Sequence, residues 1–209
     1  SDDCWENEKK IQPNNVNLTT TFKFFPEWFF CPKCNRFKPL NAWWNNWSAV
    51  VSGTSERYIP PKCGYCYEEA LKKKSSKKYY DLEQVRFVIT SPDGEIDDFP
   101  WHQWPSFNRN DLNNDENTIV LEKNAKCCDN PDLRYIRSSS FLDLAGIRVK
   151  CENCQKSNTL SGFFGVKIKK PGKLLKPVIR SASSVFFPII IKSLYLPISV
   201  ENSITEEDK

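Results

Sequence analysis

Apolar residues along this chain fall in short runs that polar turns separate. In the stretch TTTFKFFPEWFF, Thr19–Phe30, apolar positions first alternate and then become continuous, which predicts a strand whose end is buried. The run VRFVIT, which ends at Thr90, predicts a second buried strand. Two more strands are expected at Leu133–Arg137 and Gly146–Lys150. The pattern therefore favours a fold built mainly from short strands.

Helical segments are expected to be few and short. Trp43, Trp44 and Trp47 fall at helical or tight-turn spacing, and Tyr67–Lys78 is typical of a short helix followed by a loop. We interpret the three tryptophans as a cover for the core, because large aromatic side chains are mostly buried. The alternative is a base-stacking platform, which would need an exposed face.

Two Cys-x-x-Cys turns form the strongest motif in the chain. Cys31 and Cys34 make the first turn, and Cys63 and Cys66 make the second. Each turn aims two sulfurs at one point, and four thiolates in two pairs make a tetrahedral cage for Zn²⁺. Asn35 follows the first turn at a position that often has positive φ, where Gly or Asn is favoured. We predict a structural zinc site here, rather than a disulfide pair or buried free thiols.

A third Cys-x-x-Cys turn supplies two ligands for a second zinc site. It consists of Cys151 and Cys154, and the candidates for the other two ligands are Cys127, Cys128 and the only histidine, His102. Because adjacent cysteines rarely aim at the same ion, we expect one of Cys127 and Cys128 together with a distant ligand. The alternative is a turn with free thiols and no second zinc.

These turns and strands together predict an α+β, β-rich fold, in which zinc-ribbon modules combine short antiparallel sheets with a few short helices. We expect five segments: a mobile arm at 1–18, a zinc-ribbon module at 19–104, a polar excursion at 105–132, a second β module with its own cysteine turn at 133–200, and an acidic tail at 201–209.

Composition does not change the expected fold, but it bears on the core, the partners and the compartment. The 209 residues are 39% hydrophobic, which is enough for a packed core, and the net charge of +4 permits nucleic-acid binding without arguing for it. Nine cysteines, an odd number mostly at metal spacing, indicate a reducing compartment, so we expect a cytoplasmic protein. The start of the chain lacks the pattern of a signal peptide, and we expect no membrane span.

An enzyme hypothesis would rest on one acidic stretch. Glu95, Asp97, Asp98 and His102 could hold Mg²⁺ or Mn²⁺ for phosphodiester cleavage. Adjacent carboxylates on a strand point to opposite faces, however, so Asp97 and Asp98 are more typical of turn anchors. We therefore expect structural aspartates and no enzymatic activity.

Lysines are concentrated in two runs, each of which follows a cysteine turn. Lysines in such runs can hold phosphates, whereas the alternative is a solvated, flexible tip. Strand alternation places Lys167 and Lys169 on one face, opposite Val166 and Ile168. If the two runs share one face, they would bind DNA without base preference. The runs comprise Lys72, Lys73, Lys74, Lys77 and Lys78, and then Lys167, Lys169, Lys170, Lys173 and Lys176.

Four stretches in order resemble one protein family: FFPEWFFCPKCNRFKPL, VRFVITSPDGEIDDFPWHQW, AGIRVKCENCQKSNTLSGFFG and IRSASSVFFPIIIKSLYLP. They are similar to DrmB-type proteins, the accessory partners of the DISARM anti-phage helicase, over roughly Phe22 to Pro197. The resemblance implies a DNA-associated, non-catalytic subunit that pairs with a helicase in defence against phage. The chain departs from the family pattern at Asn35, Ser91 and Glu95, and family members are usually several times longer.

Two functions from different classes follow. The first is a zinc-binding accessory subunit of a defence helicase, which contributes DNA binding and contacts to its partner. The second is a protein-interaction scaffold that makes no contact with DNA. A metal-dependent nuclease is a third reading, and the acidic stretch is its only support.

Overall fold

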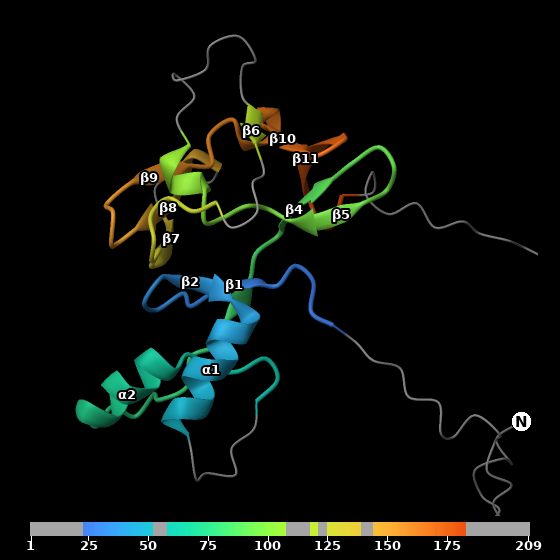
Figure 1. Ribbon diagram of the computed structural model, residues 1–209. Helices are drawn as coiled ribbons and strands as arrows, with labels where there is room; N and C mark the ends of the chain where they lie inside the picture. The colour runs from blue at the N-terminus through green and yellow to red at the C-terminus, as the bar shows by residue number, and fades with distance from the viewer. Residues whose placement is uncertain (1–22, 52–57, 108–117, 121–124, 139–143, 183–209) are drawn as a thin grey trace, which may run out of the picture.

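The computed structural model describes residues 23–51, 58–107, 118–120, 125–138 and 144–182. Within these ranges the chain forms two β-sheets and two α-helices (Figure 1). The helices lie at one end of the molecule and the five-stranded sheet at the other, with the six-stranded sheet between them. The predicted β-rich α+β class is therefore confirmed. The expected arm at 1–18 and tail at 201–209 fall outside the described residues.

The six-stranded sheet is antiparallel at each of its strand pairings. Its order is β3-β1-β2-β7-β8-β9, so the hairpin β1–β2 near the start of the described chain pairs with a hairpin far along it. Arg36 lies opposite Arg134 where the two hairpins meet. The strands are β1 (Trp28–Phe30), β2 (Arg36–Pro39), β3 (Glu83–Gln84), β7 (Leu133–Arg137), β8 (Ile147–Cys151) and β9 (Ser157–Thr159).

The five-stranded sheet has the order β5-β4-β11-β10-β6, and only its β10–β6 pair is parallel. The run VRFVIT supplies β4, as its apolar pattern predicted. Each sheet combines strands from both sides of the polar segment at 105–132, so the sheets do not follow the expected segment boundaries. The strands are β4 (Phe87–Thr90), β5 (Ile96–Asp98), β6 (Thr118–Val120), β10 (Lys167–Lys170) and β11 (Lys173–Ile179).

An aromatic core joins the two sheets. Trp101, Trp104 and Phe163 are fully buried, and the rings of Trp101 and Phe163 stack with their centroids 5.9 Å apart. The same cluster includes Phe37 from the six-stranded sheet and Leu175 from the five-stranded sheet. Burial of such large side chains supplies most of the driving force for bringing the sheets together.

The two helices pack beside the hairpin β1–β2. Helix α1 (Leu40–Val50) contacts β2 and helix α2 (Gly64–Lys72). Trp43 and Trp47 are buried on the inner side of α1, whereas Trp44 is half-buried. The tryptophans therefore cover the core, as predicted, and the base-stacking platform is not formed. Neither helix in the described ranges is long and apolar enough to cross a membrane.

Candidate metal centres

The first candidate site lies between the hairpin β1–β2 and the start of α2. Cys31 and Cys34 occupy the hairpin turn, where the Cys31 N–H donates to the carbonyl of Arg36 at 3.0 Å. Asn35 has φ of 60°, which confirms the prediction of positive φ after the turn. On the other side, Cys63 is the N-cap residue of α2 and Cys66 lies within its first turn. The helix start thus replaces the second hairpin turn that a symmetric zinc ribbon would have.

The spacing of the four sulfurs fits a tetrahedral metal ion. The Sγ atoms of Cys31 and Cys66 lie 3.7 Å apart, and those of Cys34 and Cys63 are also 3.7 Å apart. A tetrahedron with Zn–S bonds of about 2.3 Å has edges of about 3.8 Å. All four sulfurs lie within 4.8 Å of one another, and each cysteine is a free thiol. The predicted set of four is therefore brought together, in a geometry suited to Zn²⁺.

This site is largely buried, with Cys34 as its partly exposed ligand. Cys31 and Cys63 are fully buried in a small cluster with Phe29, Trp43 and Leu82. The indole Nε1 of Trp43 donates to the carbonyl of Phe29 at 3.0 Å and to that of Lys38 at 3.1 Å. Trp43 thus fastens α1 to the hairpin that carries two of the ligands. A site with four protein ligands and no open position is structural, because catalysis needs a free coordination position.

Electrostatics also favours a cation among these sulfurs. Interaction with the Cys31 thiol lowers the pKa of Cys34 and raises the pKa of Cys63, so four thiolates cannot form together without a compensating charge. Burial lowers the pKa of Arg36, but its hydrogen bond with Cys34 and the charges of Cys34, Asp132 and Tyr65 together outweigh burial and raise the pKa. Arg36 therefore places a positive charge beside the cluster, as an outer-shell residue does at a thiolate metal site.

The second candidate site repeats the geometry of the first hairpin turn. Cys151 ends β8 and Cys154 lies in the turn before β9, where the Cys151 N–H donates to the carbonyl of Lys156 at 2.9 Å. Gln155 has φ of 61°, the counterpart of Asn35. Burial opposes ionisation of Cys151, but hydrogen bonds from the backbone N–H groups of Cys154 and Asn153 lower its pKa to about 7.

Both Cys127 and Cys128 complete this set, which corrects the expectation of only one plus a distant ligand. The four sulfurs lie within 4.8 Å of one another, and those of Cys128 and Cys151 are 3.8 Å apart. The adjacent cysteines converge because they lie in a bend, not a strand, so their side chains are not forced to opposite faces. His102 is not a ligand: its ring packs edge-on against Trp28 with centroids 4.8 Å apart.

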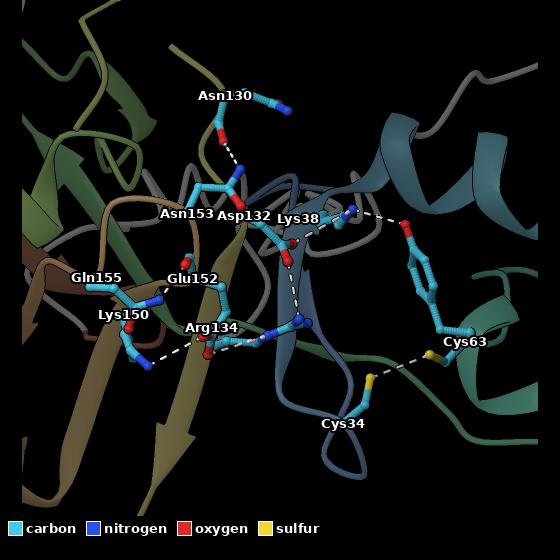
Figure 2. A network of polar contacts seen from close by, with 11 residues as sticks. Cys34, Lys38, Cys63, Asn130, Asp132, Arg134, Lys150, Glu152, Asn153 and Gln155 are labelled. Atoms are coloured by element: carbon cyan, nitrogen blue, oxygen red, sulfur yellow. Dashed lines mark hydrogen bonds and ion pairs between the residues drawn. The ribbon is translucent and has the colours of Figure 1, made fainter. Parts of the chain in front are cut away.

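A network of polar contacts runs between the two sites (Figure 2). Lys38 donates to the hydroxyl of Tyr65, which lies between Cys63 and Cys66, at 2.9 Å, and its Nζ is 4.0 Å from a carboxylate oxygen of Asp132. Asp132 binds Arg134 at 3.0 Å, and Arg134 lies 3.8 Å from Glu152, the residue after Cys151. These groups are partly exposed, so each pair contributes little energy. Their effect is to align the two cysteine turns across the sheet.

The acidic stretch does not form a metal site. Asp97 and Asp98 point to opposite faces of β5, as the strand pattern predicted. Asp98 accepts the Glu27 N–H through both carboxylate oxygens, at 3.2 and 3.1 Å, while Asp97 lies 3.5 Å from Lys170. Glu95 binds Lys170 and Lys173. Among the described residues, the groups that could hold a metal ion are the two sets of four cysteines.

The two lysine runs lie apart. The first follows α2 at one end of the molecule, and the second lies on β10 and β11 at the other end (Figure 1). The two runs therefore do not adjoin on one surface, which the sequence had left open. Lys167 and Lys169 are exposed on the face of β10 opposite the buried Ile168, as predicted.

A family model matches most of the chain. The model of a family described as a domain of unknown function (DUF8724) matches residues 6–187. A search of curated proteins finds no match to the chain. Both candidate sites lie inside the matched region.

Proposed function

We propose that this chain, which belongs to the DUF8724 family, is a non-catalytic, zinc-binding accessory subunit of an anti-phage defence helicase complex. In this role it contributes DNA binding and contacts to the helicase. The observation that carries the proposal is the pair of four-cysteine clusters, both with sulfur spacing suited to Zn²⁺. Zinc at both positions would hold a binding surface in place.

Three features support a role without catalysis. Each cluster supplies four protein ligands, which leaves no position for substrate. The carboxylates of Glu95, Asp97 and Asp98 are engaged by lysines or by a backbone N–H. Burial lowers the pKa of His102, so the imidazole is kept neutral beside Trp28 and away from these carboxylates.

The link to DNA and to a helicase comes from the resemblance to DrmB-type proteins and from the exposed lysines. A cytoplasmic location suits the eight free thiols, because a reducing compartment keeps them available to zinc. Lysines that contact phosphates make binding weak, independent of sequence and strongly dependent on salt. This behaviour would let the subunit follow a helicase along DNA.

The test combines metal analysis with binding. The full chain should contain two zinc ions and bind a DNA duplex at low salt, with an affinity that falls steadily as salt rises. We expect a helicase gene beside its own gene, and the two proteins should co-purify. Cys63→Ser should release one zinc and lower stability, because α2 then loses its tether to the hairpin. Zinc-free folded protein, or no DNA binding with or without the helicase, would contradict the proposal.

A scaffold that contacts only protein is the second candidate, and one observation favours it. A groove of about 450 Å³ opens between the two sheets, with Phe30, Tyr135, Ile147 and Ile179 among its lining residues. Polar and charged side chains, Glu83 and Arg137 among them, share this lining, and a groove of mixed character suits a side chain of a protein partner. Co-purification with the helicase in the absence of any DNA binding would select this candidate.

A further inference from the structure

The lysines of β10 and β11 divide between the two faces of the five-stranded sheet. In β10, Lys167 and Lys169 alternate with the buried Ile168. Lys169 pairs with Leu174 of β11, so Leu174 and Lys176 share the side of Lys167 and Lys169. We call this side the outer face. Lys170 and Lys173 pair with each other on the opposite side, together with Ile168 and Leu175.

The lysines on the opposite side are already neutralised. Lys170 binds Glu95 and lies 3.5 Å from Asp97, and Lys173 lies 2.9 Å from Glu95 and 3.7 Å from Asp93. The hydrogen bond from Lys170 lowers the pKa of Glu95 to about 2, so this carboxylate stays charged at neutral pH. Because Lys170 and Lys173 are already in ion pairs with these carboxylates, they contribute little to the binding of a charged partner.

The outer-face lysines, in contrast, are exposed. Among the described residues, no carboxylate lies within ion-pair distance of Lys167, Lys169 or Lys176. Among the described strand residues of the sheet, the acidic side chain on this side is Asp98 of β5, whose carboxylate accepts the Glu27 N–H. The outer face is thus positively charged, and its complement is a polyanion.

The spacing of these lysines suits a nucleic-acid backbone. Lys167 and Lys169 are two residues apart on one strand, about 6.7 Å. Lys169 and Lys176 are diagonal neighbours across adjacent strands, about 7–8 Å apart. Leu174 and Val120 are the large exposed apolar side chains between and beside them, and neither is aromatic. The described residues of this face therefore offer charge for two or three successive phosphates and no aromatic ring for stacking a base.

The first lysine run is a weaker candidate. Lys73 is paired with Glu69 at 2.5 Å, and the Nζ of Lys77 lies over the Tyr80 ring, 5.0 Å from its centroid. Lys74 has φ of 51°, in the turn that ends α2. This tip lies at the end of the molecule away from the outer face (Figure 1).

We propose that Lys167, Lys169 and Lys176 on the outer face form the contact to the phosphodiester backbone of DNA, and that the tip after α2 does not. This inference rests on the proposed function and assigns it to one surface. Contacts of this kind hold the backbone without reading the base sequence.

The test compares two triple variants that remove the same charge from the full, zinc-loaded chain. Lys167→Gln, Lys169→Gln and Lys176→Gln are combined in the face variant. Lys72→Gln, Lys74→Gln and Lys78→Gln are combined in the tip variant. Fluorescence anisotropy with a labelled DNA duplex gives affinity across a salt series, and zinc content with circular dichroism confirms that each variant is folded.

Each phosphate contact contributes about 0.9 to the salt slope of duplex binding. Loss of three contacts should make the slope shallower by about 2.7, which removes about 40-fold of the affinity change between 50 and 200 mM salt. The face variant should show this loss and the tip variant should keep the parent slope. A variant with Lys170→Gln and Lys173→Gln should also bind nearly as the parent does.

The outcomes separate this inference from the proposed function. If the tip variant loses binding and the face variant keeps it, the assignment is wrong while DNA binding stands. If the parent binds no DNA, both are wrong. Binding to poly-glutamate with the same salt slope, without binding to DNA, would assign the outer face to an acidic protein and overturn the inference.

Discussion

Asp98 offers the sharpest test of how the acidic stretch is used. Its carboxylate is partly buried and accepts the Glu27 N–H through both oxygens, at 3.2 and 3.1 Å. Burial is the largest cause that raises its pKa from the ordinary 3.8 to about 6, and the charges of Glu27 and Asp97 raise it further. The hydrogen bond from the Glu27 N–H and the charge of Lys23 lower the pKa and offset part of this rise. Asp98→Asn keeps an oxygen that can accept the Glu27 N–H but removes the charge. The change should therefore alter stability in a way that depends on pH.

The sign follows from proton linkage. Below about pH 4 the carboxyl is mostly protonated in both the folded and the unfolded chain, so burying it carries no charge penalty for the free energy of folding. As pH rises towards 6, the unfolded chain ionises first, so the folded chain becomes relatively less stable. At 1.36 kcal/mol per pKa unit the full difference is about 3 kcal/mol. Solvent screening of a partly exposed group reduces this to roughly 1–2 kcal/mol.

Denaturant unfolding of zinc-loaded parent and Asp98→Asn, from about pH 5 to about pH 7.5, measures this difference. Comparison at each pH cancels the proton dependence that the zinc ligands give to both proteins. The variant should gain about 1 kcal/mol relative to the parent across this range. Asp97→Asn is the matched control, and it should lose a few tenths of a kcal/mol at every pH with its contact to Lys170.

A stability difference between parent and Asp98→Asn that does not change with pH would refute the assignment of Asp98 as a buried anchor. A metal-dependent nuclease activity in the parent that disappears in Asp98→Asn would refute the structural role altogether. The pH dependence and the activity assay are independent readouts, so a folding defect cannot be mistaken for a lost active site.

Two further predictions concern the metal centres. Cys151→Ser should lower the zinc content from two ions to one per chain by elemental analysis, whereas Cys4→Ser, outside both sets of four, should leave it at two; a zinc content of two in Cys151→Ser would remove the second site. Trp43→Phe should lower the free energy of unfolding by about 1–3 kcal/mol, because the carbonyls of Phe29 and Lys38 lose their indole donor. An unchanged denaturation midpoint would show that this donor does not fasten α1.

The first metal site could be predicted from the sequence because its determinants are local. The spacing of Cys31 and Cys34 sets one turn, and Asn35 satisfies the positive φ that follows it. The start of the second helix was predicted wrongly, because the sequence pattern placed it at Tyr67. Helix α2 begins at Gly64, because Cys63 is its N-cap residue, and it ends at Lys72, shortly before the positive φ of Lys74.

The second site and the sheets depend on contacts between distant segments, which local patterns do not reveal. Cys127 and Cys128 converge because the chain bends there, and the expectation that adjacent cysteines rarely aim at the same ion gave the wrong ligand set. In the same way, β4 pairs with β11, which lies far along the chain. Apolar alternation predicts that a strand exists but not which strand it pairs with.

The topology explains why two metal centres suit one chain. Both hairpin turns that carry ligands, β1–β2 and β8–β9, belong to the six-stranded sheet, and β7 joins them. Metal bound at one site would therefore secure one side of this sheet through α2, and metal bound at the other would secure the opposite side through the bend at Cys127. The five-stranded sheet shares the aromatic core and has no cysteine ligand on its strands. This division keeps the exposed lysines of β10 and β11 separate from the cysteine clusters, which belong to the six-stranded sheet and its neighbouring segments.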